Sequence, residues 1–301
     1  MMCIFQPGDF QYIDSTAFNV DRPCHIYVIA SRPRIGVIKD SLTSDDDSIS
    51  LSFKIWQQDT YSERIVKLRN DFVPKGPVSI ETKYPFTSFT LSSGENSMMA
   101  KSALLLSQLR PRSVEDIYLD LQVLYVGQSY GTDGSRTAPE RLEKHETLQA
   151  VYGEASRDFP DREIWIMLFS FEQMVIAKFD GVTSFSDSDR KGDKERALKF
   201  FNTVWTGGIA EKQFICFTEA AMIRYFQPKY NDHFKYNFPN PAHTSYSECY
   251  DLDVNSVNVE LGTFDAIKEK LYSDSIPSRS IHFATFALHD AKERRSMFDF
   301  I

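Results

Sequence analysis

Hydrophobic and polar positions alternate along much of the first hundred residues. At 48–56, Ile, Leu, Phe and Ile occupy every second position, between Ser and Lys residues. This period of two predicts strands with one buried face. The apolar run at 25–30 and the segment 78–91 predict further strands. We therefore expect residues 1–95 to form a β-rich accessory or recognition region that contributes no catalytic side chain.

The pattern changes in the middle of the chain, where helical and strand signals follow one another. The sequence predicts helices at 98–109, 138–152, 195–205 and 210–226, and strands at 117–126 and 164–171. Residues 180–193 are rich in Ser, Asp and Gly, which predicts a loop. We expect these elements to form one core at 96–236, with an insertion around 172–209.

A cluster of Asn and Pro residues at 237–241 marks the expected start of a third region. The patterns after it predict a strand at 252–261, a short helix at 264–272 and a strand at 280–288. Residues 237–301 are thus expected to form a strand–helix–strand extension. The predicted fold class is α+β: a small antiparallel or mixed sheet flanked by helices, with a β-rich N-terminal region and a C-terminal α/β extension.

Charge and cysteine content narrow the possible functions. The 301 residues include 34 Lys and Arg against 42 Asp and Glu, a formal net charge of −8. Proteins that bind nucleic acid through overall charge are usually basic, so such binding would need a local patch here. The N-terminus has no signal-peptide pattern, and no apolar run is long enough to span a membrane. The cysteines are scattered without metal-ligand spacing, which indicates idle thiols in a reducing cytoplasm.

Two groups of residues with catalytic chemistry stand close together in the predicted core. Tyr125 and Gly127 fall at the end of the strand expected at 117–126. Arg141 and His145 are four residues apart on the next predicted helix, so they share one face of it. A guanidinium binds phosphate through its planar fork of donors, and an imidazole titrates near neutral pH. Each residue also has an ordinary alternative as part of a charged helix face or as a strand aromatic.

A third group lies much further along the chain. Glu219 falls on the predicted helix at 210–226, and Asn231 follows twelve residues later, just past Pro228. A lone carboxylate suits Mg²⁺, which keeps several waters and needs few protein oxygens. More than seventy residues separate Glu219 from His145, so only tertiary folding can bring them together.

The order and spacing of these groups resemble the GIY-YIG endonuclease family. In that family a small sheet carries two tyrosine motifs, one helix carries an essential Arg, and a later helix carries a metal-binding Glu that an Asn follows. The resemblance covers residues 116–232. It implies a GIY-YIG-like core that hydrolyses phosphodiester bonds of nucleic acid, with DNA as the expected substrate, water as nucleophile and a divalent metal ion.

The resemblance also implies a role for each residue. Glu219 would bind Mg²⁺ or Mn²⁺, and Arg141 would clamp the scissile phosphate. His145 or a tyrosinate would accept the proton of the attacking water. Tyr125 would position water or phosphate, and Asn231 would tie the end of the catalytic helix to the sheet.

The first tyrosine motif of the family, Gly-Ile-Tyr on a neighbouring strand, has no clean match. The nearest is Ile117-Tyr118, only seven residues before Tyr125. An odd spacing along one strand would place Tyr118 and Tyr125 on opposite faces. The expected partner is therefore Tyr118, Tyr130 or a tyrosine further upstream such as Tyr84.

Two functions stay open at this point. The first is the metal-dependent endonuclease, and the second is a non-catalytic GIY-YIG-like binding or scaffold protein within a larger complex. The acidic balance favours the second, or a nuclease whose protein partner or second copy helps to hold DNA. The glycine-rich stretch 127–134 lacks the spacing and Lys of a phosphate-binding loop, so nucleotide binding there is not expected.

Overall fold

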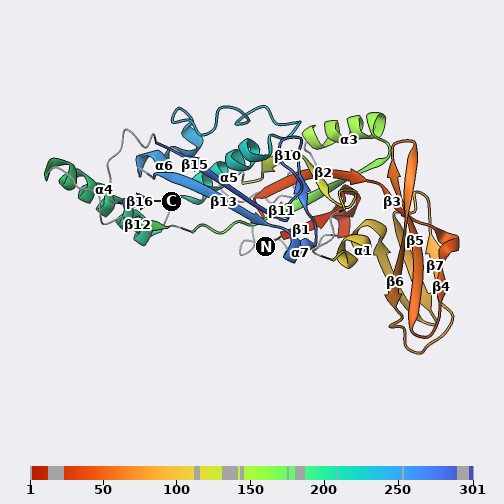
Figure 1. Cartoon of the computed structure of the whole chain (residues 1–301). Helices are drawn as coiled ribbons and strands as arrows, with labels where there is room; N and C mark the ends of the chain where they lie inside the picture. Colours follow the sequence, from red (N-terminus) through yellow and green to blue (C-terminus); the bar gives the residue numbers. More distant parts are fainter. Residues whose placement is uncertain are drawn as a thin grey trace.

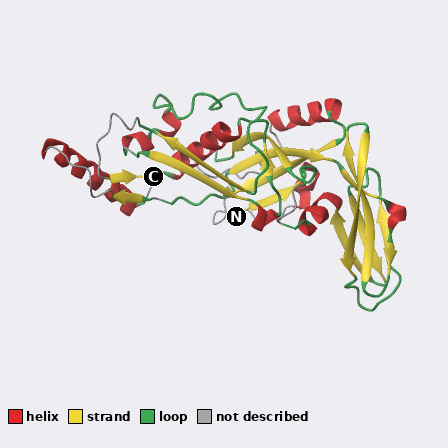
Figure 2. Ribbon diagram, in the orientation of Figure 1, coloured by secondary structure: helices red, strands yellow, loops and turns green. Residues whose placement is uncertain are grey.

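The central sheet lies in the middle of an elongated molecule (Figure 1, Figure 2). The computed structural model describes residues 2–12, 24–111, 116–130, 142, 146–174, 176–179, 187–207, 209–252, 254–289 and 298–300. One end of the molecule is a set of long strands, and the other carries helix α4. The described part contains sheets and helices in an α+β arrangement, which confirms the predicted class.

Strands from both halves of the chain make up the central sheet. Its order is β1 (Met2–Phe5), β11 (Arg162–Phe169), β2 (Ile26–Pro33), β10 (Leu121–Gln128) and β14 (Leu271–Tyr272). Neighbours are antiparallel except β14, which runs parallel to β10, so the sheet is mixed. β2 is buried along its whole length and β11 almost so. Burial on both faces explains their near-continuous apolar runs.

Helices cover both faces of this sheet. α5 (Glu211–Phe226) packs on one face, where Met222 and Ile223 join the core with the inner residues of the strands. α3 (Glu146–Asp158) packs on the other face through residues such as Val151. The two helices correspond to the helical patterns predicted at 210–226 and 138–152, of which 138–141 and 143–145 lie outside the described residues.

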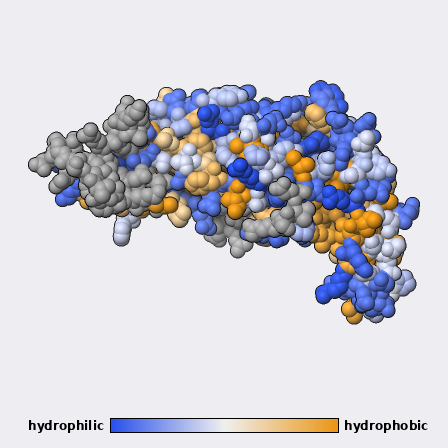
Figure 3. Space-filling model, in the orientation of Figure 1, coloured by the Kyte–Doolittle hydropathy of each residue, from blue (hydrophilic) through white to orange (hydrophobic). Residues whose placement is uncertain are grey.

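A β-sandwich is inserted between β2 and β10. One sheet holds β3 (Ile35–Val37), β4 (Thr43–Ser44), β5 (Ser48–Gln57) and β6 (Thr60–Arg69), and the other holds β7 (Ser79–Thr82), β8 (Ser88–Ser93) and β9 (Asn96–Lys101). The chain returns to the central sheet through α1 (Ser102–Leu109). β5 buries every second residue, as its alternation predicts, and Phe53 packs against Phe89 with ring centroids 6.0 Å apart. Figure 3 shows apolar side chains gathered where this sandwich meets α1.

The pairing of strands divides the chain differently from the expected boundaries. β1 and β2 belong to the central sheet, although they fall within the region 1–95 expected to be a separate accessory unit. β14 brings part of the expected extension at 237–301 into the same sheet. Both differences arise because strand pairing depends on partners far away in sequence, which the local pattern does not identify.

The remaining elements lie around the core and at the end opposite the sandwich. Two short sheets pair β12 (Ala177–Phe179) with β16 (Phe298–Phe300), and β13 (Ser256–Gly262) with β15 (Ile281–Ala287). The other helices and 3₁₀ turns are α4 (Asp187–Thr206), α6 (Glu248–Asp251), α7 (Phe264–Ile267), η1 (Pro7–Tyr12), η2 (Lys39–Ser41) and η3 (Thr244–Tyr246). Residues 187–193 are helical rather than the predicted loop. α4 is largely exposed, so few of its positions carry an apolar periodic signal.

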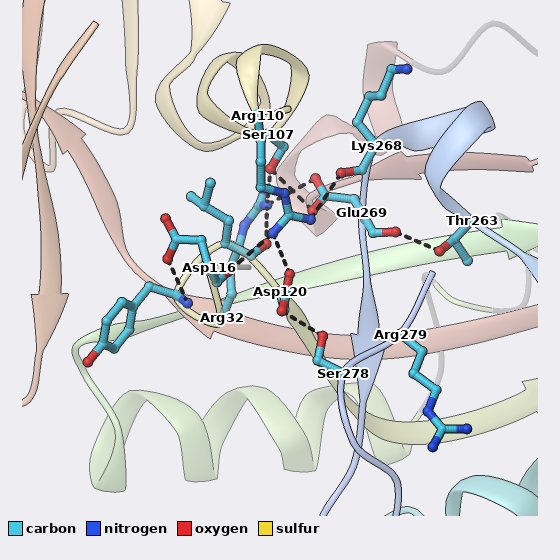
Figure 4. A network of polar contacts seen from close by, with 12 residues as sticks. Arg32, Ser107, Arg110, Asp116, Asp120, Thr263, Lys268, Glu269, Ser278 and Arg279 are labelled. Carbon is cyan, nitrogen blue, oxygen red and sulfur yellow. Dashed lines mark hydrogen bonds and ion pairs between the residues drawn. The ribbon is translucent and has the colours of Figure 1, made fainter. Parts of the chain in front are cut away.

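A buried network of charged side chains joins β2, β11 and the C-terminal segment. Figure 4 shows the part between β2 and the C-terminal segment. Arg32 is fully buried and forms an ion pair with Glu269, with 3.0 Å between Nη1 and Oε1. Its Nε lies 3.5 Å from Oε1 of Glu163, and its guanidinium lies 4.3 Å from the ring centroid of Trp165. Burial raises the pKa of Glu163 and of Glu269, and the charge of Arg32 opposes the shift. The face of the sheet that carries these side chains is therefore closed to solvent at this end.

A second buried pair extends the network to α1 and β10. Arg110, just after α1, forms an ion pair with Asp120, just before β10. Asp120 also accepts a hydrogen bond from the hydroxyl of Ser278 at 2.5 Å. Figure 4 shows the two pairs side by side. We call Arg32, Arg110, Asp120, Glu163 and Glu269 the charged junction, because it joins the return from the sandwich to the sheet.

Candidate functional site

Two tyrosines meet across β2 and β10, at the end of the sheet far from the charged junction. Tyr125 and Gly127 lie on β10, and Gly127 is directly opposite Tyr27 in the antiparallel register. The ring centroids of Tyr27 and Tyr125 are 6.0 Å apart. Tyr27 is fully buried, whereas Tyr125 is partly exposed. The tyrosine on the neighbouring strand is thus Tyr27.

Gly127 makes room for these rings. A Cβ atom at this position would lie 2.5 Å from both Cζ and Oη of Tyr27, and 2.7 Å from Cε1 of Tyr125. Such distances are far below van der Waals contact. Glycine is therefore the residue that lets both tyrosine rings lie over the strand at this point.

A β-bulge at Leu124 sets the direction of Tyr125. The pairing of β10 with β2 shifts by one residue between Val123 and Tyr125, and Leu124 is the extra residue. Side chains normally alternate between the faces of a strand. With the bulge, Leu124 and Tyr125 both pack on the face that carries Tyr27. Without it, Tyr125 would point to the opposite face.

The segment after α5 holds the bulge in place. Oδ1 of Asn231 accepts a hydrogen bond from the backbone N–H of Val126 at 2.9 Å, and its Nδ2 donates to the Val126 carbonyl at 2.8 Å. The backbone N–H of Tyr230 donates to the Leu124 carbonyl at 3.0 Å. Asn231 is buried, so these bonds are shielded from water. They tie the chain that follows α5 to β10, two residues before Gln128 ends the strand.

The end of α5 directs the chain into this segment. Gln227 has a φ of 49°, and its N–H donates to the Ile223 carbonyl at 2.8 Å, which closes the last turn of the helix. Pro228 follows and cannot continue the helix. The short distance from Pro228 to Asn231 then places the amide of Asn231 against β10.

Glu219 lies on α5 beside the end of β10. Its side chain is partly exposed, whereas Ala220 and Met222 next to it are buried. Burial and then the negative charge of Glu219 raise the pKa of the Cys216 thiol, which lies one turn earlier on the helix. Gln128, the last residue of β10, points its Nε2 at the same thiol over 4.0 Å. Glu219 and Gln128 thus both act on Cys216.

His25 lies just before β2, near the same end of the sheet. Its ring centroid is 5.0 Å from that of Tyr130, and its Nε2 is 3.9 Å from Oε1 of Glu211. Burial lowers the pKa of His25, and the charge of Glu211 opposes this in part. Its Nδ1 has no hydrogen-bond partner among the described residues. The lowered pKa favours the neutral imidazole, which can accept a hydrogen bond through one ring nitrogen.

The predicted helix residues Arg141 and His145 both lie outside the described residues. Leu142, between them, is helical and buried on the face of the sheet that carries Tyr27. The structure therefore gives no distance from either Arg141 or His145 to Glu219.

The three expected partners of Tyr125 lie elsewhere. Tyr118 is in a turn before β10 and is 38% exposed, Tyr130 follows β10, and Tyr84 is 82% exposed in the sandwich. The residues opposite β10 are His25-Ile26-Tyr27, which differ from Gly-Ile-Tyr only in the first residue. That similarity is visible in the sequence. The sequence pattern alone does not identify Tyr27 as the neighbour of Tyr125, because the sandwich separates the two tyrosines by about a hundred residues instead of a short hairpin turn.

The residues that the structure describes contain no group of three or more His, Cys, Asp or Glu side chains able to hold a metal ion. A magnesium site with one protein carboxylate would not form such a group, because Mg²⁺ retains most of its waters. Glu219, a partly exposed carboxylate, has the chemistry of such a single ligand. The described cysteines are free thiols.

Comparison with known proteins returned no match: no family model, no curated protein and no solved structure matches the chain. Among the described helices, none combines the length and apolar character needed to cross a membrane.

Proposed function

We propose that this chain is a metal-dependent endonuclease with a GIY-YIG-like core. The observation that carries the proposal is the pairing of Tyr27 with Tyr125 on antiparallel strands, with Gly127 beneath both rings. In this assignment His25-Ile26-Tyr27 takes the place of the first tyrosine motif, and Tyr125-Val126-Gly127 is the second. The strand order β11-β2-β10, with a helix on each face, also supports a small antiparallel core.

The resemblance gives each residue a role, although Arg141 and His145 lie outside the described residues and α5, which carries Glu219, packs on the face of the sheet opposite Tyr27 and Tyr125. Glu219 would bind the divalent ion, Mg²⁺ or Mn²⁺, which when bound neutralises charge on the phosphate and on the leaving oxygen. Tyr27 is fully buried and holds the ring of Tyr125, whose exposed part would orient water or phosphate. Arg141 would clamp the phosphate, and His145 would accept a proton from the attacking water.

The backbone braces explain how such a site would keep its geometry. Tyr125 shares a face with Tyr27 only because of the bulge at Leu124, and Asn231 and Tyr230 bond to the backbone around that bulge. A catalytic group must stay within about 0.5 Å of its working position, and support of this kind provides that precision. Positioning of the tyrosine is therefore the proposed role of Asn231.

The proposed substrate is DNA, and the proposed setting is the cytoplasm. The net charge of −8 gives little general attraction to DNA, so a protein partner or a second copy of the chain would contribute to binding. Salt dependence provides a check, since few phosphate contacts predict a shallow fall of affinity with salt.

A plasmid-nicking assay in EDTA, Mg²⁺ and Mn²⁺ tests the proposal. We expect the wild type to nick DNA only with a divalent ion, and Glu219→Gln to lower the rate about 10²-fold or more while the melting temperature stays unchanged. Glu195→Gln, at an exposed position on α4, is the matched control and should cleave like wild type. Arg141→Ala should lower the rate as Glu219→Gln does.

Two outcomes contradict the proposal. Equal cleavage by the wild type and Glu219→Gln would show that the assigned ligand is wrong. If the wild type neither cleaves nor binds Mg²⁺ or Mn²⁺ by calorimetry, the non-catalytic scaffold is the better description.

A further inference from the structure

A groove of about 730 Å³ runs between the β-sandwich and the core, on the α3 side of the sheet. The sandwich contributes Trp56 and the turn between β5 and β6. The core contributes Tyr118, Phe159 and Tyr230. The backbone N–H of Gln58 donates to Oδ2 of Asp161 at 3.0 Å, which connects the two sides. The groove exists only because the sandwich is inserted beside the sheet.

The floor of the groove is polar and well ordered by hydrogen bonds. Nη2 of Arg162 donates to the Ser31 carbonyl at 3.1 Å and to Oε1 of Gln122 at 3.3 Å. Nε2 of Gln122 donates in turn to Oδ1 of Asp274 at 2.9 Å. Nη1 of Arg162 has no bonding partner in the described part of the chain, and Arg162 lines the groove. A fixed guanidinium with unused donors is suited to a carbonyl or ring-nitrogen acceptor of a ligand.

The groove is continuous with the proposed cleavage site. Leu124, the bulge residue next to Tyr125, lines it, and so does Tyr230, which precedes Asn231. A strand of nucleic acid bound at Tyr125 would therefore have its neighbouring nucleotides at the mouth of the groove.

Charge and size limit what the groove can hold. Its charged lining residues are Asp59, Asp161 and Asp274 against Arg162 and Lys229, so acidic groups outnumber basic ones. Phosphates are disfavoured there, whereas neutral bases are not. The volume is in the range of pockets that enclose a small organic ligand, which suits one or two unpaired nucleotides rather than a duplex. The aromatic side chains offer faces on which bases of any sequence stack.

We propose that this groove binds unpaired bases of the nucleic-acid strand next to the cleavage site, stacked on Trp56 and Tyr118. The inference rests on the proposed function and deepens it: the substrate has a single-stranded segment beside the scissile phosphate. Bases enter the groove, and the phosphates stay outside it. The sandwich thus selects the substrate, and the sheet cleaves it.

Equilibrium binding in EDTA tests the groove without any cleavage. A fluorescent thymidine oligonucleotide of about 12 nucleotides, within the site sizes known for single-strand binders, is titrated with the full chain and followed by anisotropy. We expect Trp56→Ala and Tyr118→Ala each to weaken binding about tenfold, the loss of one stacked base. Trp56→Phe keeps an aromatic face and should retain most of the affinity. Tyr84→Ala is the control, because Tyr84 is 82% exposed in the sandwich and does not line the groove.

The outcomes separate this inference from the proposed function. If Trp56→Ala and Tyr118→Ala both bind the oligonucleotide with wild-type affinity, and their melting curves show folded protein, the proposed binding of bases in the groove is wrong. Binding of free thymidine monophosphate but not of the oligonucleotide also overturns it, in favour of a small-molecule pocket. If single-strand binding depends on Trp56 and Tyr118 but no divalent ion supports cleavage, the groove stands and the nuclease proposal fails.

Discussion

The same three strands build two very different ends of the central sheet. At one end, β2 and β11 carry Arg32 and Glu163, which are buried in the charged junction. At the other end, β2 and β10 carry Tyr27 and Tyr125, and the ring of Tyr125 is partly exposed. On β2, only five positions separate Tyr27 from Arg32.

The two ends differ in which groups hold them together. The charged junction is held by charged side chains that form ion pairs with one another. The tyrosine end is held through the backbone, by the amide of Asn231 and the N–H of Tyr230. These bonds are made by the backbone of β10 and do not involve the ring of Tyr125. The buried side chains of the first end serve stability, and the second end carries Tyr27 and Tyr125 of the proposed function.

Removing the central charge of the junction should have the largest effect. Arg32→Met leaves Glu163 and Glu269 buried without their cation, which costs about 3–5 kcal/mol in the free energy of unfolding. Urea denaturation followed by circular dichroism measures the loss. The control Arg157→Met removes an exposed ion pair with Asp158 and should leave the midpoint unchanged.

A fall of less than about 1 kcal/mol in Arg32→Met would show that the junction is not a stabilising centre. Where the single variant fails to fold, a variant that combines Arg32→Met with Glu163→Gln and Glu269→Gln removes all three charges. It should recover part of the stability, because uncharged groups are less costly to bury.

The backbone brace at the tyrosine end is expected to contribute less. Asn231→Ala leaves both the N–H and the carbonyl of Val126 buried without a partner, a cost of about 2–3 kcal/mol. Calorimetric melting measures this, with the exposed Asn202→Ala on α4 as control. If Asn231→Ala and Asn202→Ala lowered the melting temperature equally, the hydrogen bonds of Asn231 would not be a specific source of stability.

A methyl group under the tyrosine rings should lower the free energy of unfolding by a similar or smaller amount than Asn231→Ala does. Gly127→Ala forces Tyr27 and Tyr125 to move, because the new Cβ lies 2.5 Å from Tyr27, and overpacking of this kind costs about 1–3 kcal/mol. Gly153→Ala meets no atom within 4 Å in helix α3 and should instead gain about 0.5–1 kcal/mol. A lower melting temperature for Gly127→Ala and a higher one for Gly153→Ala would support the stacked geometry. An unchanged melting temperature for Gly127→Ala would contradict it.

The smallest effect concerns the pH dependence of the junction. Burial raises the pKa of Glu269 in the folded chain above its ordinary value of 4.5. Its contribution to stability is complete below pH 4.5 and is lost as the pH rises through the higher folded value. Glu269→Gln cannot titrate, so its unfolding free energy should fall less steeply above pH 4.5, by at most one proton or roughly 1.4 kcal/mol per pH unit. If the unfolding free energies of the wild type and of Glu269→Gln fell with pH at the same slope above pH 4.5, the raised pKa of Glu269 would be contradicted.

Local features of the fold were predictable from the sequence because they depend on neighbours along the chain. The alternation at 48–56 predicted β5, and the apolar run at 164–171 predicted most of β11. The helical pattern at 210–226 predicted α5, with Pro228 as its end. In each case, burial of one face or of both faces of the element produces the spacing of apolar residues that is seen in the sequence.

The candidate site was only partly predictable. Tyr125, Glu219 and Asn231 lie on or beside elements whose type the sequence predicts, but the sequence points to Tyr118, Tyr130 or a tyrosine further upstream such as Tyr84 as the partner of Tyr125. Tyr27 reaches it through strand pairing across a hundred intervening residues.

The sequence by itself predicted the type of β5, β11 and α5 and the chemistry of the residues that they carry. Tertiary structure alone decided that β1 and β2 belong to the central sheet, that a bulge turns Tyr125 toward Tyr27, and that Arg32 meets Glu269. The physical reason is the range of the interactions. Helix and strand periods reflect burial repeated every few residues, whereas strand register, bulges and buried ion pairs depend on groups that lie far apart until the chain has folded.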